Sequence, residues 1–250
     1  CHADLYREWV RTPMGRSLRP ANTSEQLGLA GTAVTIPNPD GSSIYEVAAV
    51  DGKLLQSAYA PRPEGGELFR VSYPLEWAIG SGTNGYTYVL RRGSHLFQAP
   101  LSYFSRAGVW DLSPGYELAD QGFSRPIGAA CTGCHAGRPN PVRDRPGLYE
   151  DPPFSELSIG CENCHGPGQL HGQAKSHPKG QPDPTIVNPA RLKPGLAENI
   201  CMRCHQGGDT RVNRPGRTEV DFRPGTWLRE TLAILKAVPQ PAAAQSDVLE

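Results

Sequence analysis

Residues 131–135 read Cys-Thr-Gly-Cys-His, and the same C-x-x-C-H pattern returns at residues 161–165 and 201–205. The pattern is typical of c-type haem attachment, in which two thiols bond to one haem and the following histidine binds its iron. The attachment thiols are then Cys131, Cys134, Cys161, Cys164, Cys201 and Cys204. The proximal iron ligands are His135, His165 and His205.

Two other kinds of cysteine site deserve comparison with haem. Paired C-x-x-C units also bind zinc, and small secreted domains use cysteines for disulfides. Neither chemistry requires a histidine directly after the second cysteine of each pair. Because the chain has only 7 His among 250 residues, three such histidines are improbable by chance. The sequence therefore favours haem over zinc or disulfides.

The chain opens with Cys1-His2, the last two residues of another C-x-x-C-H pattern. Residues 4–11 follow with helical spacing, and Tyr6 and Trp9 are suited to pack against a haem face. We expect Cys1 to carry a fourth haem and His2 to bind its iron, in a chain that lacks its true N-terminus. The alternative is a lipidated Cys1 at the start of a mature lipoprotein. Four c-type haems are expected, three of them on complete motifs.

Charge and composition limit the class of protein. The 25 basic and 25 acidic residues balance, which argues against a nucleic-acid-binding protein, since such proteins carry a basic excess. No apolar run approaches the roughly 18 residues of a transmembrane helix. The 28 Gly and 25 Pro indicate many loops and turns. We therefore predict a mostly irregular and α-helical multihaem protein with a small antiparallel β insert and a core filled by packed haems.

Three regions are predicted within one compact unit. Residues 1–29 form an N-terminal haem helix segment, residues 30–124 a β-rich insert, and residues 125–250 a three-motif haem region with a C-terminal helix. The unit is expected to be a fragment of a longer chain. The aromatic residues of the insert are expected to form its own small core.

Local patterns predict several strands and helices. Residues 44–50 and 53–59 form two strands joined at Asp51-Gly52, a strong hairpin signal. Pro100 interrupts residues 96–104, which predicts an edge strand or none. Further strands are expected at residues 67–73 and 86–91. Helices are expected at residues 196–205 and 227–238, the second of them amphipathic by its spacing.

Short segments along nearly the whole chain match a known family. They are Cys1-His2 with Tyr6 and Trp9, Met14–Leu18, Ile79–Gly82, Asp111–Tyr116, Cys164–Gly168 with His171, and Ile186–Arg191. The chain resembles bacterial multihaem c-type cytochromes of the tetrahaem type, the group that includes the electron acceptor of hydroxylamine oxidation. It resembles more closely a branch of longer multihaem proteins within that family.

The resemblance implies distal iron ligands as well. His171 lies in the segment that matches the distal-ligand position of the family, and its alternative role is a bond to a haem propionate. Met14 follows the first helix, where relatives place a distal ligand, and a Met ligand raises the potential. The alternative for Met14 is a core filler. His95 and His177 are weaker candidates. If neither binds iron, one or two haems would be open, filled by a Tyr or water, or ligated by a neighbouring chain.

The basic residues of the chain are mostly arginine. Arginine forms bidentate pairs with carboxylates, and each haem carries two propionates. Candidate propionate clamps near the motifs are Arg138, Arg143, Arg145, Arg191 and Arg203. The alternative is that these arginines keep the surface soluble.

The motifs together predict electron transfer through closely packed covalent haems, as a wire or shuttle or as a subunit of a larger complex or polymer. The alternative is a multihaem oxidoreductase with one open haem that acts on small nitrogen or sulfur compounds. We expect an electron-transfer protein rather than an enzyme, because no acid–base cluster lies beside a motif. A third option is a haem-bearing scaffold whose β insert docks a partner.

The expected partners are other redox proteins or cytochromes, with a homo-oligomer or filament as a further option and with no nucleic acid. Haem is attached covalently outside the bacterial cytoplasm, so the expected location is periplasmic or extracellular. Association with a membrane through a complex or an anchor is left open.

Overall fold

The computed structural model describes residues 2–174, 181–208 and 210–237. Cys1 and His177 lie outside these residues. The helices are α1 (Ala3–Trp9), α2 (Ser24–Ala30), α3 (Ala129–His135), α4 (Glu162–His165), α5 (Gln169–Gln173) and α6 (Pro194–Met202), with short 3-10 turns η1 (Met14–Arg16), η2 (Pro189–Arg191), η3 (Glu219–Asp221) and η4 (Leu228–Glu230). The strands are β1 (Leu18–Pro20), β2 (Val34–Pro37), β3 (Ile44–Val50), β4 (Lys53–Pro61), β5 (Glu67–Ile79), β6 (Thr87–Arg92), β7 (His95–Gln98), β8 (Leu101–Phe104), β9 (Val109–Leu112), β10 (Arg125–Pro126), β11 (Arg138–Pro141), β12 (Tyr149–Glu156), β13 (Thr210–Asn213) and β14 (Leu232–Leu235).

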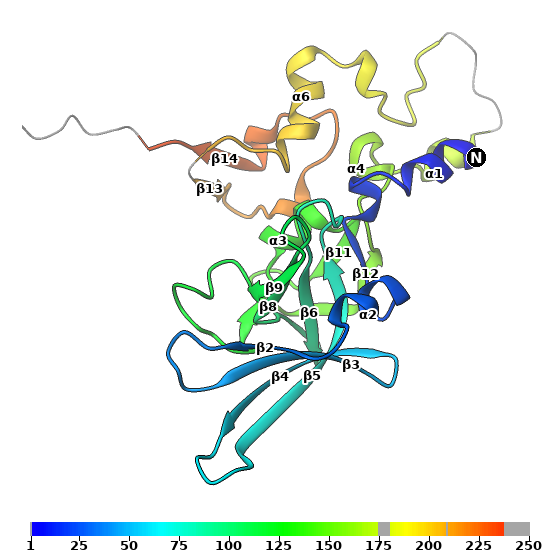
Figure 1. Cartoon of the computed structure of the whole chain (residues 1–250). Helices are drawn as coiled ribbons and strands as arrows, with labels where there is room; N and C mark the ends of the chain where they lie inside the picture. Colours follow the sequence, from blue (N-terminus) through cyan, green and yellow to red (C-terminus); the bar gives the residue numbers. More distant parts are fainter. Residues whose placement is uncertain (1, 175–180, 209, 238–250) are drawn as a thin grey trace, which may run out of the picture.

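An eight-stranded antiparallel sheet dominates the molecule (Figure 1). Its strands run in the order β10-β7-β6-β5-β4-β3-β2, and β1 also pairs with β5. The first half of β5 pairs with β4, whereas its second half pairs with β6 and β1. The prediction of a mostly irregular and α-helical fold with a small β insert is therefore wrong. Many of the glycines and prolines lie at turns between strands, and side chains of the sheet supply a core of their own.

The hairpin at Asp51-Gly52 is confirmed. The residues pair from Val50 with Lys53 to Ile44 with Tyr59 in an unbroken register. Asp51 and Gly52 have φ angles of 49° and 72°, and two consecutive positive values are what a tight two-residue hairpin turn requires. The turn chemistry of these two residues thus sets the register of β3 on β4.

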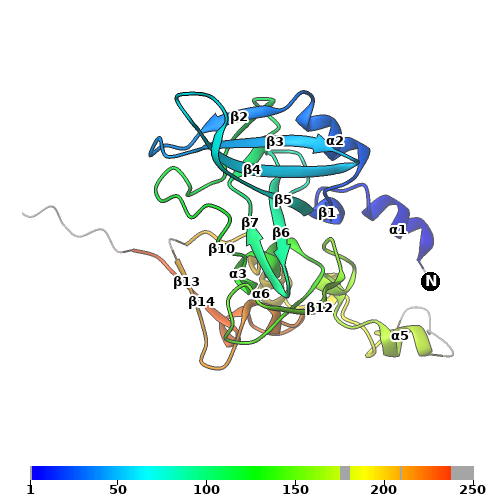
Figure 2. The ribbon, with the colours of Figure 1, turned by 90° about the horizontal axis from the view of Figure 1, so that it is seen from below.

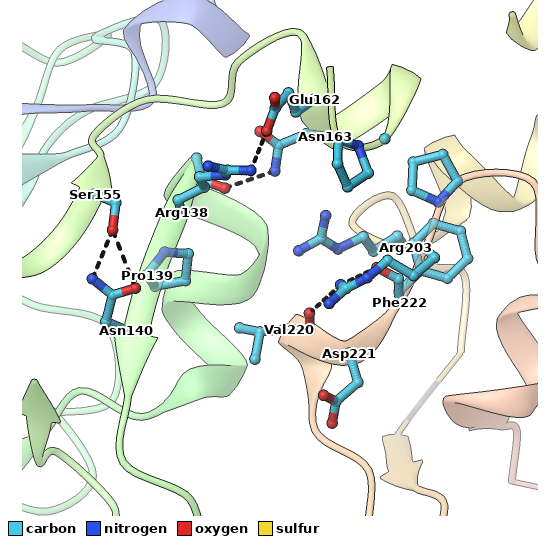
Figure 3. Close-up of a pocket in the computed structure, with 15 residues that line it drawn as sticks. Arg138, Pro139, Asn140, Ser155, Glu162, Asn163, Arg203, Val220, Asp221 and Phe222 are labelled. Atoms are coloured by element: carbon cyan, nitrogen blue, oxygen red, sulfur yellow. Dashed lines mark hydrogen bonds and ion pairs between the residues drawn. The ribbon is translucent and has the colours of Figure 1, made fainter. Parts of the chain in front are cut away.

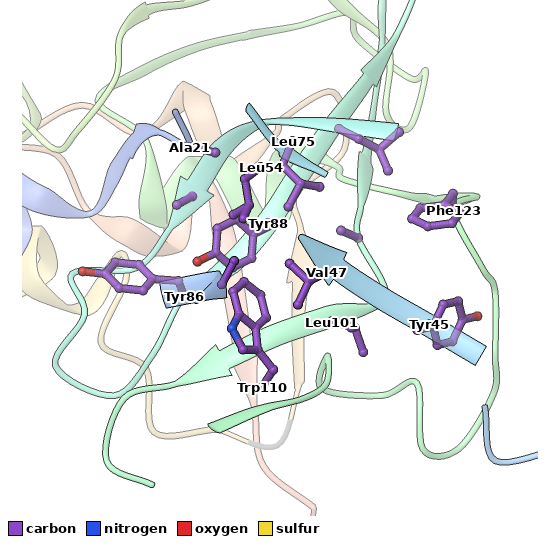
Figure 4. Close-up of a cluster of buried hydrophobic side chains, with 14 of the residues drawn as sticks. Ala21, Tyr45, Val47, Leu54, Leu75, Tyr86, Tyr88, Leu101, Trp110 and Phe123 are labelled. Atoms are coloured by element: carbon purple, nitrogen blue, oxygen red, sulfur yellow. The ribbon is translucent and has the colours of Figure 1, made fainter. Parts of the chain in front are cut away.

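Aromatic side chains fill the main hydrophobic core, as expected for the insert (Figure 4). Tyr88 stacks on Trp110 with ring centroids 5.0 Å apart. The Tyr88 hydroxyl donates to Oε1 of the buried Gln26 at 2.7 Å, which joins α2 to the sheet. Tyr45 and Tyr86 are also buried, whereas Phe69 lies on the outer part of β5 and is 43% exposed.

Pro100 separates two strands instead of weakening one. β7 ends at Gln98 and β8 begins at Leu101. β7 lies between β6 and β10, so the prediction that residues 96–104 form an edge strand or none is wrong. A proline fits between these two strands because no strand pairing at this position requires its missing N–H. Its carbonyl accepts from Ser113 N at 2.7 Å.

The C-terminal segment also differs from its prediction. Residues 196–205 do contain a helix, α6, but residues 227–235 form the turn η4 and the strand β14, and Val238 lies outside the described residues. β14 pairs with β13 from Leu232 opposite Asn213 to Leu235 opposite Thr210. A short apolar run fits helical and extended periods equally well, and pairing with a nearby strand decides between them.

A second hydrophobic cluster attaches the motif region to the sheet. It contains Leu18, Ile79, Val89, Leu96, Ile127, Ala136, Tyr149 and Phe154. The Tyr149 hydroxyl lies 3.0 Å from Thr132 Oγ1 and donates to the Ile127 carbonyl at 3.0 Å, so β12 and α3 are held together. Figures 1 and 2 show α3 and α6 on the side of the molecule away from β2–β4. Across the described ranges, no helix is long and apolar enough to span a bilayer.

Candidate functional site

Each complete motif forms one helical turn. In the second motif, the Cys161 carbonyl accepts from Cys164 N at 3.1 Å and from His165 N at 2.9 Å. In the third motif, the Cys201 carbonyl accepts from the equivalent two amides at 3.2 and 2.9 Å. Residues three and four apart share one face of a helix. The fold therefore places both thiols and the imidazole of a motif on the same side, as attachment of one haem requires.

The first motif lies within α3 and has the same helical form. The Thr132 carbonyl accepts from Ala136 N at 2.8 Å at the end of the helix. The six cysteines of the three motifs are all free thiols, with the first of each pair exposed and the second half-buried. In the described part of the chain, no group of three His, Cys, Asp or Glu side chains has the arrangement of a metal cluster.

Thiols of the first and third motifs lie against each other. Cys134 Sγ is 3.6 Å from the Arg203 carbonyl and accepts from Arg211 Nη1 at 3.7 Å. A hydrogen bond with Cys204 and the Arg211 charge lower the pKa of Cys134 to about 6, although burial opposes the shift. The same hydrogen bond, together with burial, raises the pKa of Cys204. The α3 and α6 motifs thus meet at their second cysteines.

The imidazole of the second motif is held by a backbone carbonyl. His165 Nδ1 lies 2.9 Å from the Val187 carbonyl, and Val187 N donates to the His165 carbonyl at 3.0 Å. A hydrogen bond at Nδ1 fixes the tautomer and the ring orientation, with Nε2 as the nitrogen directed elsewhere. This arrangement suits a proximal metal ligand.

The fold brings His2, which precedes α1, together with His171 on α5. Their ring centroids are 6.0 Å apart and the ring planes are within 10° of parallel. Figure 2 shows the N-terminus, with α1, and α5 on the same side of the molecule. His171 Nδ1 lies 2.8 Å from Asp183 Oδ2, and Asp183 Oδ1 accepts from Thr185 N at 2.8 Å. Both of the predicted ligands therefore face a common space.

The other predicted iron ligands are exposed or partly exposed. Met14 begins η1 and is 42% exposed. Three residues later, the Ser17 hydroxyl donates to the His135 carbonyl at 2.7 Å, so the Met14 segment runs beside the first motif. His135 and His205 are exposed. His95 is exposed at the start of β7, where its ring stacks on Phe97 at 6.1 Å.

A polar cavity of about 380 Å³ is lined by residues in or next to the three motifs (Figure 3). Its walls include Arg138 after the first motif, Asn163 inside the second and Arg203 inside the third. Arg138 forms an ion pair with Glu162. Arg203 is only 9% exposed, and its Nε has no hydrogen-bond partner. A buried guanidinium with an orphaned donor beside three haem motifs fits the presence of haem carboxylates.

Sequence reasoning missed the groups that orient the histidines. Asp183 lies 12 residues after His171, and no spacing rule connects the two positions. Val187 acts through its carbonyl, so its side-chain identity carries no signal. The Cys134 contact with Arg211 crosses 77 residues and depends on the β13–β14 hairpin, which the sequence did not predict.

The fold is one that a cytochrome uses. The chain matches the crystal structure of outer cell wall cytochrome OcwA with a TM-score of 0.53 and 18% sequence identity, over 94% of this chain and 43% of that chain. The chain thus spans less than half the length of that cytochrome. No family model and no curated protein matches the sequence.

Proposed function

We propose that the protein transfers electrons through c-type haems bound covalently at its three complete C-x-x-C-H motifs and at Cys1-His2. The motif turns, the free thiols and the cytochrome fold support this proposal. Haem iron supplies the one-electron chemistry, and the chain holds and orients it.

The geometry of His2 and His171 carries the proposal. Two imidazoles bound to opposite sides of one metal, with metal–nitrogen bonds of about 2.0–2.1 Å, hold their ring centroids roughly 6 Å apart. The observed separation is 6.0 Å with nearly parallel planes. His2 and His171 would hold the iron of a haem attached at Cys1. A fully ligated iron exchanges electrons without binding a substrate.

Haems at the first and third motifs would lie close together. The contact of Cys134 with Cys204 puts the attachment sulfurs of the first and third motifs side by side. Each sulfur would be bonded to the edge of a haem, so the two haem edges would lie close to each other at this point. Tunnelling between them is then short, which suits a wire or a shuttle.

The finer assignments follow from the same proposal. We infer a place within the tetrahaem cytochrome type, with His135, His165 and His205 as the remaining proximal ligands and Met14 as a candidate distal ligand beside the first motif. Other redox proteins are the partners that this function implies. A periplasmic or extracellular location fits the chemistry of haem attachment and the cell-wall location in the name of the similar cytochrome.

The intact mass of the denatured holoprotein tests the proposal, because covalent haems remain attached. We expect the mass of the chain plus four haems, together with a low-spin absorption spectrum. A mass with three haems would remove Cys1 and His2 from the haem sites and overturn the His2–His171 assignment. A mass with no haem would overturn the proposed function as a whole.

A further inference from the structure

The polar cavity shown in Figure 3 has features of a binding site that the haem motifs themselves do not use. Part of its wall comes from residues that follow a motif or lie between the two cysteines of a motif, such as Arg138, Asn163 and Arg203. Glu162 and Asn163 contribute from α4, and Phe222 closes one side from the segment after η3. Residues in or next to all three motifs therefore line the cavity, and none of their attachment cysteines does.

Most of the polar groups around the cavity have partners within the protein. Glu162 pairs with Arg138 and accepts from Gly168 N at 2.8 Å. Asp221 lies 3.3 Å from Arg143 Nη2. Arg223 donates to the Val220 and Phe222 carbonyls at 3.0 and 3.1 Å. The two carboxylates are thus paired with arginines, and the Arg223 donors are satisfied by neutral carbonyls without a counterion.

Arg203 is the exception among the described residues that line the cavity. The structure gives its guanidinium no ion pair and no hydrogen bond, and its Nε is buried without a partner. Figure 3 shows the side chain reaching into the space between the Arg138 segment and Val220. A buried, uncompensated guanidinium is costly, because the charge loses its hydration without gaining a counterion.

We propose that this cavity binds a carboxylate or a similar planar oxyanion, with Arg203 as its principal donor. A guanidinium offers a fork of N–H groups that fits two oxygens of one anion, and Arg203 Nε is one of these groups. Asn163 Nδ2 already donates one of its two N–H groups to the Gly137 carbonyl at 2.9 Å. The anion would complete the charge balance at the junction of the three motifs.

The same chemistry has two sources. One is a propionate of a haem held by a neighbouring motif, which rests on the proposed function. The other is a free small anion from solution, which requires only the folded holoprotein. A propionate would occupy the cavity permanently, whereas a free anion would exchange and would be saturable.

Acetate serves as the probe for the free-anion source. Calorimetric titration of the holoprotein with acetate is compared among the wild type, R203Q, R203K and R217Q. Arg217 is exposed, so R217Q makes the same chemical change outside the cavity. For a free-anion site, wild type and R217Q bind acetate, and R203Q weakens binding by about tenfold or more, since a charge-assisted bond is lost. R203K keeps the charge without the fork and is expected to lie between them.

The haem propionate source gives a different result with the same variants. Wild type then binds no acetate, and R203Q lowers the reduction potential of one haem, because the propionate charge loses its counterion. The resonance Raman band of that propionate shifts in R203Q, shifts less in R203K and is unchanged in R217Q. R203K serves in place of R203Q if the glutamine variant fails to fold.

The inference is overturned if wild type binds no acetate and if both Arg203 variants leave the potentials and the Raman bands unchanged. The number of haems in the intact mass is measured on every sample. If the haem count is normal and the Arg203 variants change none of these readouts, the anion site alone is rejected. A missing haem would reject the proposed function.

Discussion

At the scale of single residues, two histidines are oriented by acceptors of different charge. His165 meets a neutral carbonyl of Val187, whereas His171 meets the carboxylate of Asp183. A carboxylate partner makes an imidazole a stronger metal ligand than a carbonyl partner does. His171 should therefore be the stronger ligand of these two histidines, and its removal should have a distinct spectroscopic effect.

Replacing His171 by alanine should open one axial position of one haem. We expect a high-spin component in the absorption spectrum and binding of about one additional carbon monoxide per chain, because the sixth ligand of that iron is lost. Carbon monoxide titration of the reduced protein measures this. Leu170→Ala is the control, since Leu170 precedes His171 on α5 and is 65% exposed. An unchanged spectrum in H171A would remove His171 from the iron.

Tyr149 makes the free energy of unfolding depend on pH in the alkaline range. Burial raises the pKa of Tyr149 to about 12. The folded protein keeps this proton while the unfolded chain loses it near pH 10, so the free energy of unfolding falls as the pH rises from about 10 to 12. Tyr149→Phe should reduce this slope and should lower the stability at neutral pH by about 1 kcal/mol through lost hydrogen bonds.

Urea unfolding of the holoprotein at several pH values between 8 and 12 tests the effect of Tyr149. Tyr6→Phe is the control, because Tyr6 is 58% exposed. The slope of Y6F should match that of the wild type. If Y149F also keeps the wild-type slope, the alkaline transition belongs to the other buried tyrosines.

At the scale of elements, the sequence predicts a hairpin whose turn is set by its own two residues. It does not predict a strand whose conformation is set by pairing with a distant segment. Asp51-Gly52 predicts its hairpin because only a few residues tolerate two positive φ values in succession. Residues 232–235 are a strand because β13 lies beside them, and no feature of their own spacing reveals that partner. The fold class was misjudged for the same reason, since the sheet depends on pairs spread over the whole insert.

Gly52→Val tests the role of the hairpin turn. Gly52 has a φ of 72° and no atom within 4 Å of an added Cβ, so the effect would come from backbone strain alone. We expect a loss of roughly 1–2 kcal/mol in the free energy of unfolding. Asp51→Asn is the control, because Asn-Gly is equally suited to this turn. Equal stability of G52V and D51N would contradict the assignment of the turn.

At the scale of the whole molecule, the segment after α1 connects the regions around two motifs. The Ser17 hydroxyl donates to the His135 carbonyl at 2.7 Å and accepts from Ile159 N at 3.1 Å. Ser158 donates to the Leu18 carbonyl at 2.6 Å, and the Trp9 indole donates to the Ile159 carbonyl at 2.8 Å. These bonds hold the start of the described chain against the first and second motifs.

Ser17→Ala should therefore destabilise the molecule more than a surface serine does. The variant leaves the partly buried amide of Ile159 without its acceptor, which costs about 1 kcal/mol or more. The melting temperature should fall by roughly 2–4 °C for each kcal/mol in a chain of this size. Thermal unfolding of the holoprotein measures the change, with the exposed Ser42→Ala as control. Equal melting temperatures in the two variants would show that Ser17 does not join these regions.

The bonds of this first segment have a consequence for the time at which it can fold. They cross 118 residues at Ser17, 140 at Leu18 and 150 at Trp9. At a synthesis rate of about 5–20 residues per second, Ile159 appears roughly 8–30 s after Trp9. Until His135 appears, the indole of Trp9 and the hydroxyl of Ser17 have none of these long-range partners. This segment is thus among the last parts of the described chain to reach its native contacts, so it does not act as an early folding nucleus.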